Sequence, residues 1–440
     1  MNKSVLMAGS ALLFVPGAAE GQSHPAGAAN QERLETIGNL QAEVERLRAQ
    51  VDALIAANAR SGSARGAHAP NPPSPDLAEP APAVTFKPSG RLQLDAGWIG
   101  RPDGADNTGL GFGSEIRRAR LGAEGRVGRD FGYRVEVDFA NAEAELADAY
   151  IKWAVSKSVS IKLGQHNSFQ SLEELSSSRF TSFMERAAFT DAFGFERRVG
   201  ASMTYKSGAV IASGGVFTAN SAELTDDENA ISADARLVYA PVLGASQLHF
   251  GASFHHRDLD GERAVKYRQR PFLHLTDRRF LATPSLAIER ETSVGAELAV
   301  IHGPFHAVGE AHWLTADRAT GTDPGFFGGY AEVGYFLTGE TRGYKDGTFA
   351  RTKPARSLSQ GGAGAIQVNF RHDRLDLNDG GVLGGTQDLV ALGLTWIPEG
   401  NVRFLLNYGH LIYKSGPVAV AVGRSRYAND TVAMRAQIDF

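Results

Sequence analysis

The sequence predicts an all-β protein: a transmembrane barrel of sixteen antiparallel strands, preceded by a short α-helical coiled coil. Two features of the barrel region predict this class. From residue 91 onward, short runs alternate apolar and polar side chains with a period of two, as β-strands with two different faces do. The last of these runs ends the chain on an aromatic residue, Phe440, which is typical of exported outer-membrane barrels.

The composition excludes several other classes of protein. The 440 residues include no Cys, which rules out a disulfide-stapled scaffold and any Cys-ligated metal site. No run of eighteen apolar residues occurs, so no α-helix of the chain is expected to span a membrane. The net charge of -4 argues against bulk binding of nucleic acid.

Residues 1–21 have the pattern of a secretory signal peptide. A basic start at Lys3 is followed by an apolar run from Val5 to Val15 and then by small residues. This apolar run is too short to cross a bilayer. A buried N-terminal helix is the alternative interpretation.

Residues 32–57 are expected to form a coiled coil in the periplasm. Apolar residues recur every seven positions in two interleaved sets that correspond to heptad positions a and d: Ile37, Val44 and Val51, and Leu40, Leu47 and Leu54. A single amphipathic helix packed on a domain is the alternative. Residues 58–90 are rich in Pro and Ala and predict a semi-rigid linker.

Residues 91–440 form the barrel in this interpretation. A soluble β-sandwich also alternates, but its single apolar face must be large because it is the core. Here the apolar face often carries Ala, and the polar face carries charges of both signs, which suits a lipid-facing exterior around a wet lumen. The clearest run is 431–440, where Val432 and Met434 alternate with Ala433 and Arg435.

Sixteen strands are expected, an even number as a closed bacterial barrel requires. They are placed at 91–100, 116–126, 131–139, 145–154, 159–165, 197–206, 209–218, 230–240, 246–256, 292–302, 305–315, 327–338, 362–372, 387–397, 402–413 and 431–440. With the N-terminal helix in the periplasm, the long connections 166–196, 257–291 and 414–430 face outward. Because successive connections alternate between the two ends of an antiparallel barrel, the long connection 339–361 is expected to be periplasmic.

Two long segments are basic in a chain that is slightly acidic. Residues 263–279 hold six basic residues and one acidic residue, and residues 340–356 hold five basic and two acidic residues. If these segments fold into the lumen, their cations attract anions. Binding of acidic lipopolysaccharide, or simple solvation, is the alternative. The candidate anion-binding residues on the wall and the basic segments are Arg118, Arg120, Arg134, Arg198, Arg236, Arg268, Arg270, Arg351 and Lys353.

Several stretches of the barrel region resemble the phosphate-selective porin O and P family. They include RARLGAEGR at 118–126, FGYRVEVDF at 131–139, DAYIK at 148–152, SLEEL at 171–175, FMER at 183–186, RRVG at 197–200, FLTGE at 336–340, LGLTW at 392–396 and NVRF at 401–404. The resemblance implies a sixteen-stranded homotrimeric porin. It also implies that the 166–196 loop folds inward as a constriction, with Arg179, Glu185 and Arg186, and that family members pass phosphate or polyphosphate.

The resulting expectation is a bacterial outer-membrane porin, a water-filled channel for passive diffusion of small hydrophilic solutes, with a preference for phosphate-like anions. A non-selective porin that tethers envelope layers through the coiled coil is the alternative. The expected partners are small solutes, outer-membrane lipids and two further copies of the chain, and not nucleic acid. No cofactor, metal or enzymatic activity is expected: no phosphate-binding P-loop or His-Glu-x-x-His motif occurs, and the pair His255-His256 fits a solvated strand end better than a metal site.

Overall fold

The structure is a computed structural model that describes residues 84–101, 108–140, 143–223, 229–416 and 426–440, with Glu45, Arg46 and Ala49 in addition. The chain divides into two units, 1–80 and 81–440. The predicted signal peptide and most of the predicted coiled coil and linker lie outside the described residues. The three described residues of the first unit are helical.

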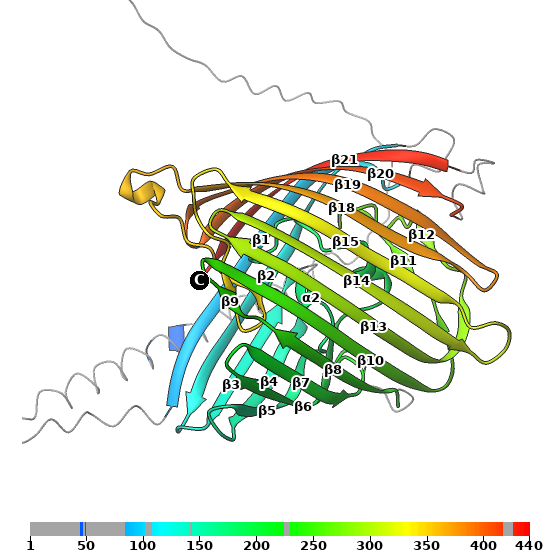
Figure 1. Cartoon of the computed structure of the whole chain (residues 1–440), viewed down its shortest axis with the longest axis horizontal. Coiled ribbons are helices and arrows are strands. Elements are labelled where there is room, and N and C mark those ends of the chain that lie inside the picture. The colour runs from blue at the N-terminus through cyan, green and yellow to red at the C-terminus, as the bar shows by residue number, and fades with distance from the viewer. Residues whose placement is uncertain are drawn as a thin grey trace, which may run out of the picture. The chain divides into compact units, whose positions relative to one another are not determined.

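The second unit is a closed antiparallel barrel, as predicted (Figure 1). Its sixteen wall strands are β1 (Val84–Ile99), β2 (Gly111–Val127), β3 (Phe131–Asp138), β4 (Glu145–Ala154), β5 (Val159–Asn167), β6 (Arg197–Ser207), β7 (Val210–Phe217), β8 (Ile231–Tyr239), β10 (Ser246–Val265), β13 (Leu286–His302), β14 (Phe305–Arg318), β15 (Gly325–Phe336), β18 (Ala365–Asp379), β19 (Val382–Glu399), β20 (Val402–Lys414) and β21 (Arg426–Asp439). Each predicted strand corresponds to one of these. β1, however, begins at Val84, so residues 84–90, which the sequence assigns to the linker, belong to the wall.

Several short helices and strands lie in the connections between the wall strands. They are α2 (Leu172–Leu175), α3 (Ala188–Ala192), β9 (Val242–Leu243), β11 (Arg268–Gln269), β12 (Leu281–Ala282), β16 (Tyr344–Lys345), β17 (Thr348–Phe349) and the 3-10 helix η2 (Leu358–Gln360). None of the described helices is long and apolar enough to cross a membrane.

The first and last strands close the barrel. β1 pairs with β21 from Arg91 opposite Asp439 to Ile99 opposite Thr431. The seam ends on a reciprocal backbone pair, in which Gly90 and Phe440 each donate an N–H to the other's carbonyl at 3.1 Å. The Phe440 ring lies over Gly90, where any Cβ would come within 2.3 Å of it. The last residue is therefore part of the closure.

The two faces of the wall have opposite chemistry. Leu121 and Ile151 are each 56% exposed on the outside, whereas the inward Arg435 is 1% exposed. This inverts the arrangement of a soluble protein and matches a barrel whose exterior faces lipid. The alternation in the sequence predicted these two faces. Backbone groups pair between neighbouring strands within the wall, so the faces differ only in the polarity of their side chains.

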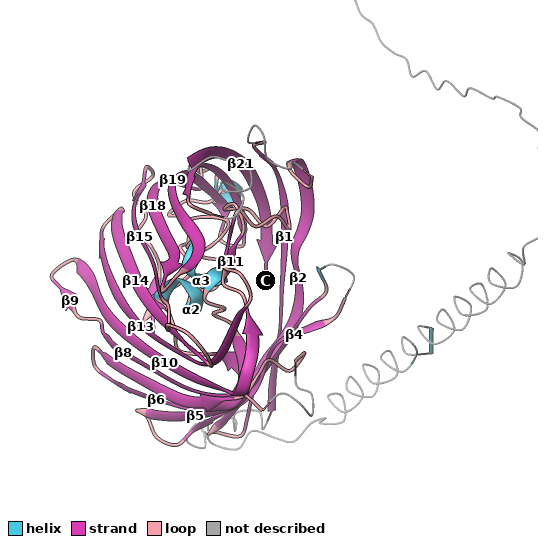
Figure 2. Ribbon diagram, turned by 90° about the vertical axis from the view of Figure 1, so that its right-hand side faces the viewer, coloured by secondary structure: helices cyan, strands magenta, loops and turns pink. Residues whose placement is uncertain are grey.

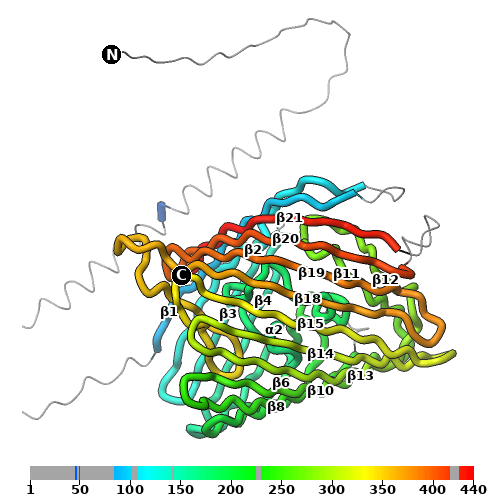
Figure 3. The backbone as a smooth tube through the Cα atoms, turned by 45° about the horizontal axis from the view of Figure 1, so that its top comes forward, coloured from blue at the N-terminus to red at the C-terminus, as the bar shows by residue number. Residues whose placement is uncertain are grey.

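Three long segments fold into the lumen, where Figure 2 shows α2, α3 and β11 inside the ring of strands. We call residues 168–196 the inward loop, residues 266–285 the hairpin loop and residues 337–364 the short-turn-end loop. The last lies at the barrel end that carries the tight turns and Phe440, opposite the end of the other two (Figure 3).

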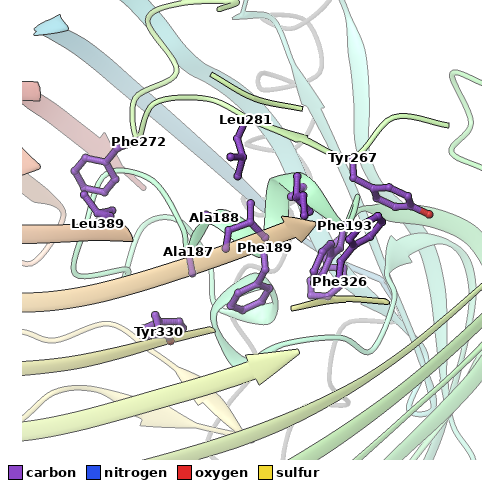
Figure 4. Close-up of a cluster of buried hydrophobic side chains, with 14 of the residues drawn as sticks. Ala187, Ala188, Phe189, Phe193, Tyr267, Phe272, Leu281, Phe326, Tyr330 and Leu389 are labelled. Atoms are coloured by element: carbon purple, nitrogen blue, oxygen red, sulfur yellow. The ribbon is translucent and has the colours of Figure 1, made fainter. Parts of the chain in front are cut away.

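These segments build an apolar core inside the barrel (Figure 4). In the inward loop, Phe189 stacks on His312 of β14 at 4.5 Å between ring centroids, and Phe183 meets Phe272 of the hairpin loop at 6.2 Å. Phe280 of the hairpin loop packs on Tyr413 of β20 at 5.3 Å. This packing fills the lumen beside strands β13 to β21, so the open space lies against the opposite wall.

Candidate ion passage

Two cavities follow one another along strands β1 to β6. The outer cavity, of about 350 Å³, reaches the hairpin loop at His274, and the inner cavity, of about 230 Å³, reaches Lys162 and Arg179. The two share a set of five lining residues, which we call the waist: Arg118, Arg120, Glu174, Arg186 and Arg197. The passage is therefore off-centre, between the wall and the inward loop.

The two cavities differ in charge. Six arginines and six carboxylates line the outer cavity. Eight cations but only two carboxylates line the inner cavity. The cations are Arg91, Arg118, Arg120, Arg134, Lys162, Arg179, Arg186 and Arg197, and the carboxylates are Asp148 and Glu174. An excess of positive charge enclosed by low-dielectric walls concentrates anions.

Ion pairs hold the wall arginines in place. Arg120 donates to Asp138 at 2.7 Å and to Glu136 at 3.0 Å, and Arg134 donates to Glu136 at 2.8 Å. Asp148 accepts from Arg197 at 2.8 Å. Glu136, which fixes several of these guanidinium groups, does not itself line either cavity. These ion pairs fix the guanidinium groups in position along the passage.

A β-bulge adds an arginine to the passage. The register between β1 and β2 shifts between Gln93 and Leu94, so that Gln93 faces Arg118 and Leu94 faces Ile116. Arg117 is the extra residue. It turns inward with Arg118 and donates to both carboxylate oxygens of Glu185, at 2.9 and 3.1 Å. Bulges re-aim side chains in this way at functional sites.

The inward loop is fastened to the wall on both sides. On the passage side, Arg91 donates to Ser178 Oγ at 2.7 Å. On the opposite side, Glu310 accepts from the backbone N–H of Leu172 at 2.8 Å, and Asp373 accepts from that of Ala188 at 2.8 Å. With wall contacts on both sides, the loop sets the width of the passage.

Arg186 organises the part of the inward loop that faces the waist. It donates to the backbone carbonyls of Glu173, Glu174 and Ser176 at 2.9 to 3.0 Å. Its guanidinium also lies 3.3 Å from the carboxylate of Glu174. Burial raises the pKa of Glu174 above its usual value, and Arg186 opposes that rise only in part.

Glu185 behaves differently from Glu174. Burial opposes its ionisation, but Arg117 and Arg435 outweigh burial and hold the pKa of Glu185 well below its usual value. Glu185 therefore remains an anion, paired with Arg117 at the outer cavity and with the buried Arg435.

The model of the family described as phosphate-selective porin O and P matches residues 86–440. The chain belongs to this family. The match spans the whole barrel, and the porin is therefore a channel of the outer membrane.

Curated relatives and solved structures agree with the family. An uncharacterised protein of Caulobacter vibrioides is 40% identical, over 92% of this chain and 89% of its own. Porin O of Pseudomonas aeruginosa is 28% identical, over 74% of this chain and 82% of its own. An anion-selective porin from Comamonas acidovorans superimposes with a TM-score of 0.51 at 12% identity, over 81% of this chain and all of its own. OmpT of Vibrio cholerae in its trimer form gives the same score at 12% identity, over 81% of this chain and all of its own.

Eight of the twelve predicted site residues of the porin line a cavity or pocket. Arg118, Arg120, Arg134, Arg179 and Arg186 line the inner cavity. Arg270 and Glu185 line the outer cavity, with Arg270 lying 3.8 Å from Asp191. Arg351 lines a separate small pocket at the short-turn end.

The other four predicted residues line neither cavity. Arg198 is buried against Glu196 at 3.3 Å, and Arg236 is locked between Glu297 at 2.6 Å and the carbonyl of Gly347 at 3.0 Å. Arg268 is exposed because strand alternation in β11 turns its neighbour Gln269 inward instead. Lys353 is also exposed.

Four cations of the passage were absent from the sequence prediction: Arg91, Arg117, Lys162 and Arg197. Arg91 had a usable signal, since it alternates with Leu92 and Leu94. Lys162 had the same signal, because it alternates with Ile161 and Leu163. Arg117 and Arg197 had no such signal in the sequence. Arg117 lies in a bulge and Arg197 is the first residue of β6, and both turn inward against the alternation of the strand.

Proposed function

We propose that the porin passes small hydrophilic solutes by passive diffusion, with a preference for phosphate-like anions. The observation that carries this proposal is the inner cavity, where eight cations face two carboxylates. Any solute that crosses the waist on this side of the inward loop meets this cavity. Cations entering it are repelled, and anions are concentrated.

The donors around the inner cavity support an oxyanion as the preferred solute. Guanidinium groups present planar pairs of N–H donors that fit phosphate and carboxylate. Between the arginines the lining also carries hydroxyl donors, namely Tyr150, Ser176, Ser177 and Ser178. A small oxyanion can exchange water for several such donors at once, and it can leave again because each contact is individually weak.

The comparisons support the same proposal. The family model carries the description phosphate-selective, and the structure from Comamonas acidovorans is described as anion-selective. We further propose that this porin assembles as a homotrimer, the form in which OmpT of Vibrio cholerae was solved. The alternative, a non-selective porin with a tethering coiled coil, depends on residues 32–57, of which only Glu45, Arg46 and Ala49 are among the described residues.

Phosphate added to purified porin in planar bilayers is expected to reduce the chloride current saturably, because phosphate occupies the donors of the inner cavity longer than chloride does. Single-channel recording at constant ionic strength measures this. Bromide, a monatomic anion of nearly the same mobility as chloride and without oxygen acceptors, serves as the control and should leave the current almost unchanged. An unchanged chloride current in phosphate would contradict the preference for phosphate-like anions.

Anion preference is expected to increase as the pH falls. The raised pKa of Glu174 means that this waist carboxylate takes up a proton at a higher pH than an ordinary Glu, and its neutralisation leaves the inner cavity one charge more positive. Glu174→Gln should show the stronger preference already at neutral pH. Reversal potentials recorded between neutral and acidic pH should change less in this variant than in the parent; equal pH dependence would show that other groups carry the effect.

A further inference from the structure

We infer that the porin binds one small monovalent anion such as chloride in a pocket separate from the two cavities, and that this anion fastens the inward loop to the short-turn-end loop. Four arginines line the pocket: Arg179, Arg342, Arg351 and Arg403. No carboxylate lines it among the described residues. The inference does not depend on which solute crosses the passage.

The carboxylates near this pocket are too few for its arginines. Asp439 pairs with both Arg179, at 3.5 Å, and Arg351. Glu332 pairs with Arg342 at 3.0 Å but also with Arg371 at 2.7 Å. Within the described part of the chain no salt bridge is formed by Arg403. Buried charges need partners, so the pocket has an unmet demand for negative charge.

Arg403 carries the sharpest sign of a missing ligand. It is only 7% exposed, and its two terminal nitrogens donate to the backbone carbonyls of Arg179 and, at 2.9 Å, Thr181. Its Nε is buried and has no hydrogen-bond partner in the structure. A buried N–H without an acceptor is disfavoured, and so is a buried guanidinium without a carboxylate. An anion in the pocket would supply both an acceptor for Nε and the missing negative charge.

The size of the pocket selects the ligand. Its volume is about 20 Å³, which is room for one water-sized body. A monatomic anion such as chloride or bromide is the closest match to this size. Arg179 lines both this pocket and the inner cavity.

The pocket joins segments that are far apart in the sequence. Arg179 and Phe180 belong to the inward loop, Arg342 and Arg351 to the short-turn-end loop, and Arg403 to β20. The ring of Phe180 has the guanidinium of Arg179 5.1 Å from its centroid and that of Arg351 at 5.3 Å. A halide among these guanidinium groups attracts both loops, and its removal leaves like charges that repel one another.

Crystals of the full chain grown in bromide test this directly. We expect an anomalous bromide peak within ion-pair distance of Arg403 in the parent and no such peak in Arg403→Met. Arg356→Met, an exposed arginine of the same loop, is the matched control and should keep the peak. Density without anomalous signal in the parent would show a water instead and would overturn the inference.

Thermal unfolding gives a second readout in solution. The parent should unfold at a higher temperature in chloride than in gluconate at equal ionic strength, because only chloride fits the pocket, and Arg403→Met should lose this difference. If Arg403→Met fails to assemble, the bromide peak and the chloride effect in the parent decide the matter. An equal chloride effect in parent and assembled variant would overturn the inference, and the ion selectivity of the passage would be untouched by either result.

Discussion

Replacing Arg134 and Lys162 together with Gln is expected to reduce the anion preference of the porin several-fold. Both side chains line the inner cavity and neither one anchors the inward loop. A charge about 7 Å from a permeating ion in water is worth roughly 0.6 kcal/mol, close to the thermal energy. Removal of two such charges lowers the concentration of anions in the cavity by about fivefold to tenfold at low salt and raises that of cations, and screening shrinks both effects at high salt.

Arg268→Gln combined with Lys353→Gln is the matched control, because it also removes one Arg and one Lys. Both residues are exposed and line neither cavity. Reversal potentials of the two double variants in the same salt gradient separate local from global charge. An equal shift in both variants would mean that the net charge of the chain, and not the inner cavity, sets the selectivity.

Deletion of Phe440 is expected to remove most of the assembled protein from the outer membrane. The deletion eliminates the reciprocal backbone pair with Gly90 and the ring that covers it. In hydrocarbon each unpaired backbone group costs several kcal/mol, since no water replaces the partner. Heat-modifiable mobility on gels of membrane fractions reports the folded amount.

Phe440→Tyr keeps both the backbone pair and an aromatic ring, and it should assemble close to the parent level. Channels that do assemble without Phe440 should keep the parent conductance and selectivity, because the residue is 62% exposed on the outside of the wall and touches neither cavity. Normal amounts of assembled barrel after the deletion would contradict the proposed role of this residue in closure.

The wall could be predicted from the sequence because each strand carries its own signal. In 431–440 the apolar Met434 and the polar Arg435 alternate without interruption, and the structure places them on opposite faces. Strand ends were less predictable. β10 continues past residue 256 to Val265, and β13 begins at Leu286 and not at 292. At the start of β13 the buried side chains Leu286 and Ile288 are apolar, because they pack in the core inside the barrel, so the pattern of apolar exterior and polar interior does not hold there.

The passage could be predicted only in part because it depends on contacts between distant segments. Arg118 and Arg120 follow the local parity and were found. Arg117 enters through a bulge, which no local pattern reveals. Arg236 obeys the parity yet is covered by the short-turn-end loop, whose Gly347 carbonyl accepts from it at 3.0 Å. Alternation identifies the face of a residue but not what folds over that face.

The reversal potential of the parent porin in a potassium chloride gradient tests the central claim most directly. Potassium and chloride have nearly equal mobility in water, so the sign of the potential reports the charge of the passage itself. The cation excess of the inner cavity predicts a potential of the sign that favours chloride, largest at low salt and smaller as screening increases. A potential of zero, or one that favours potassium, would contradict the account.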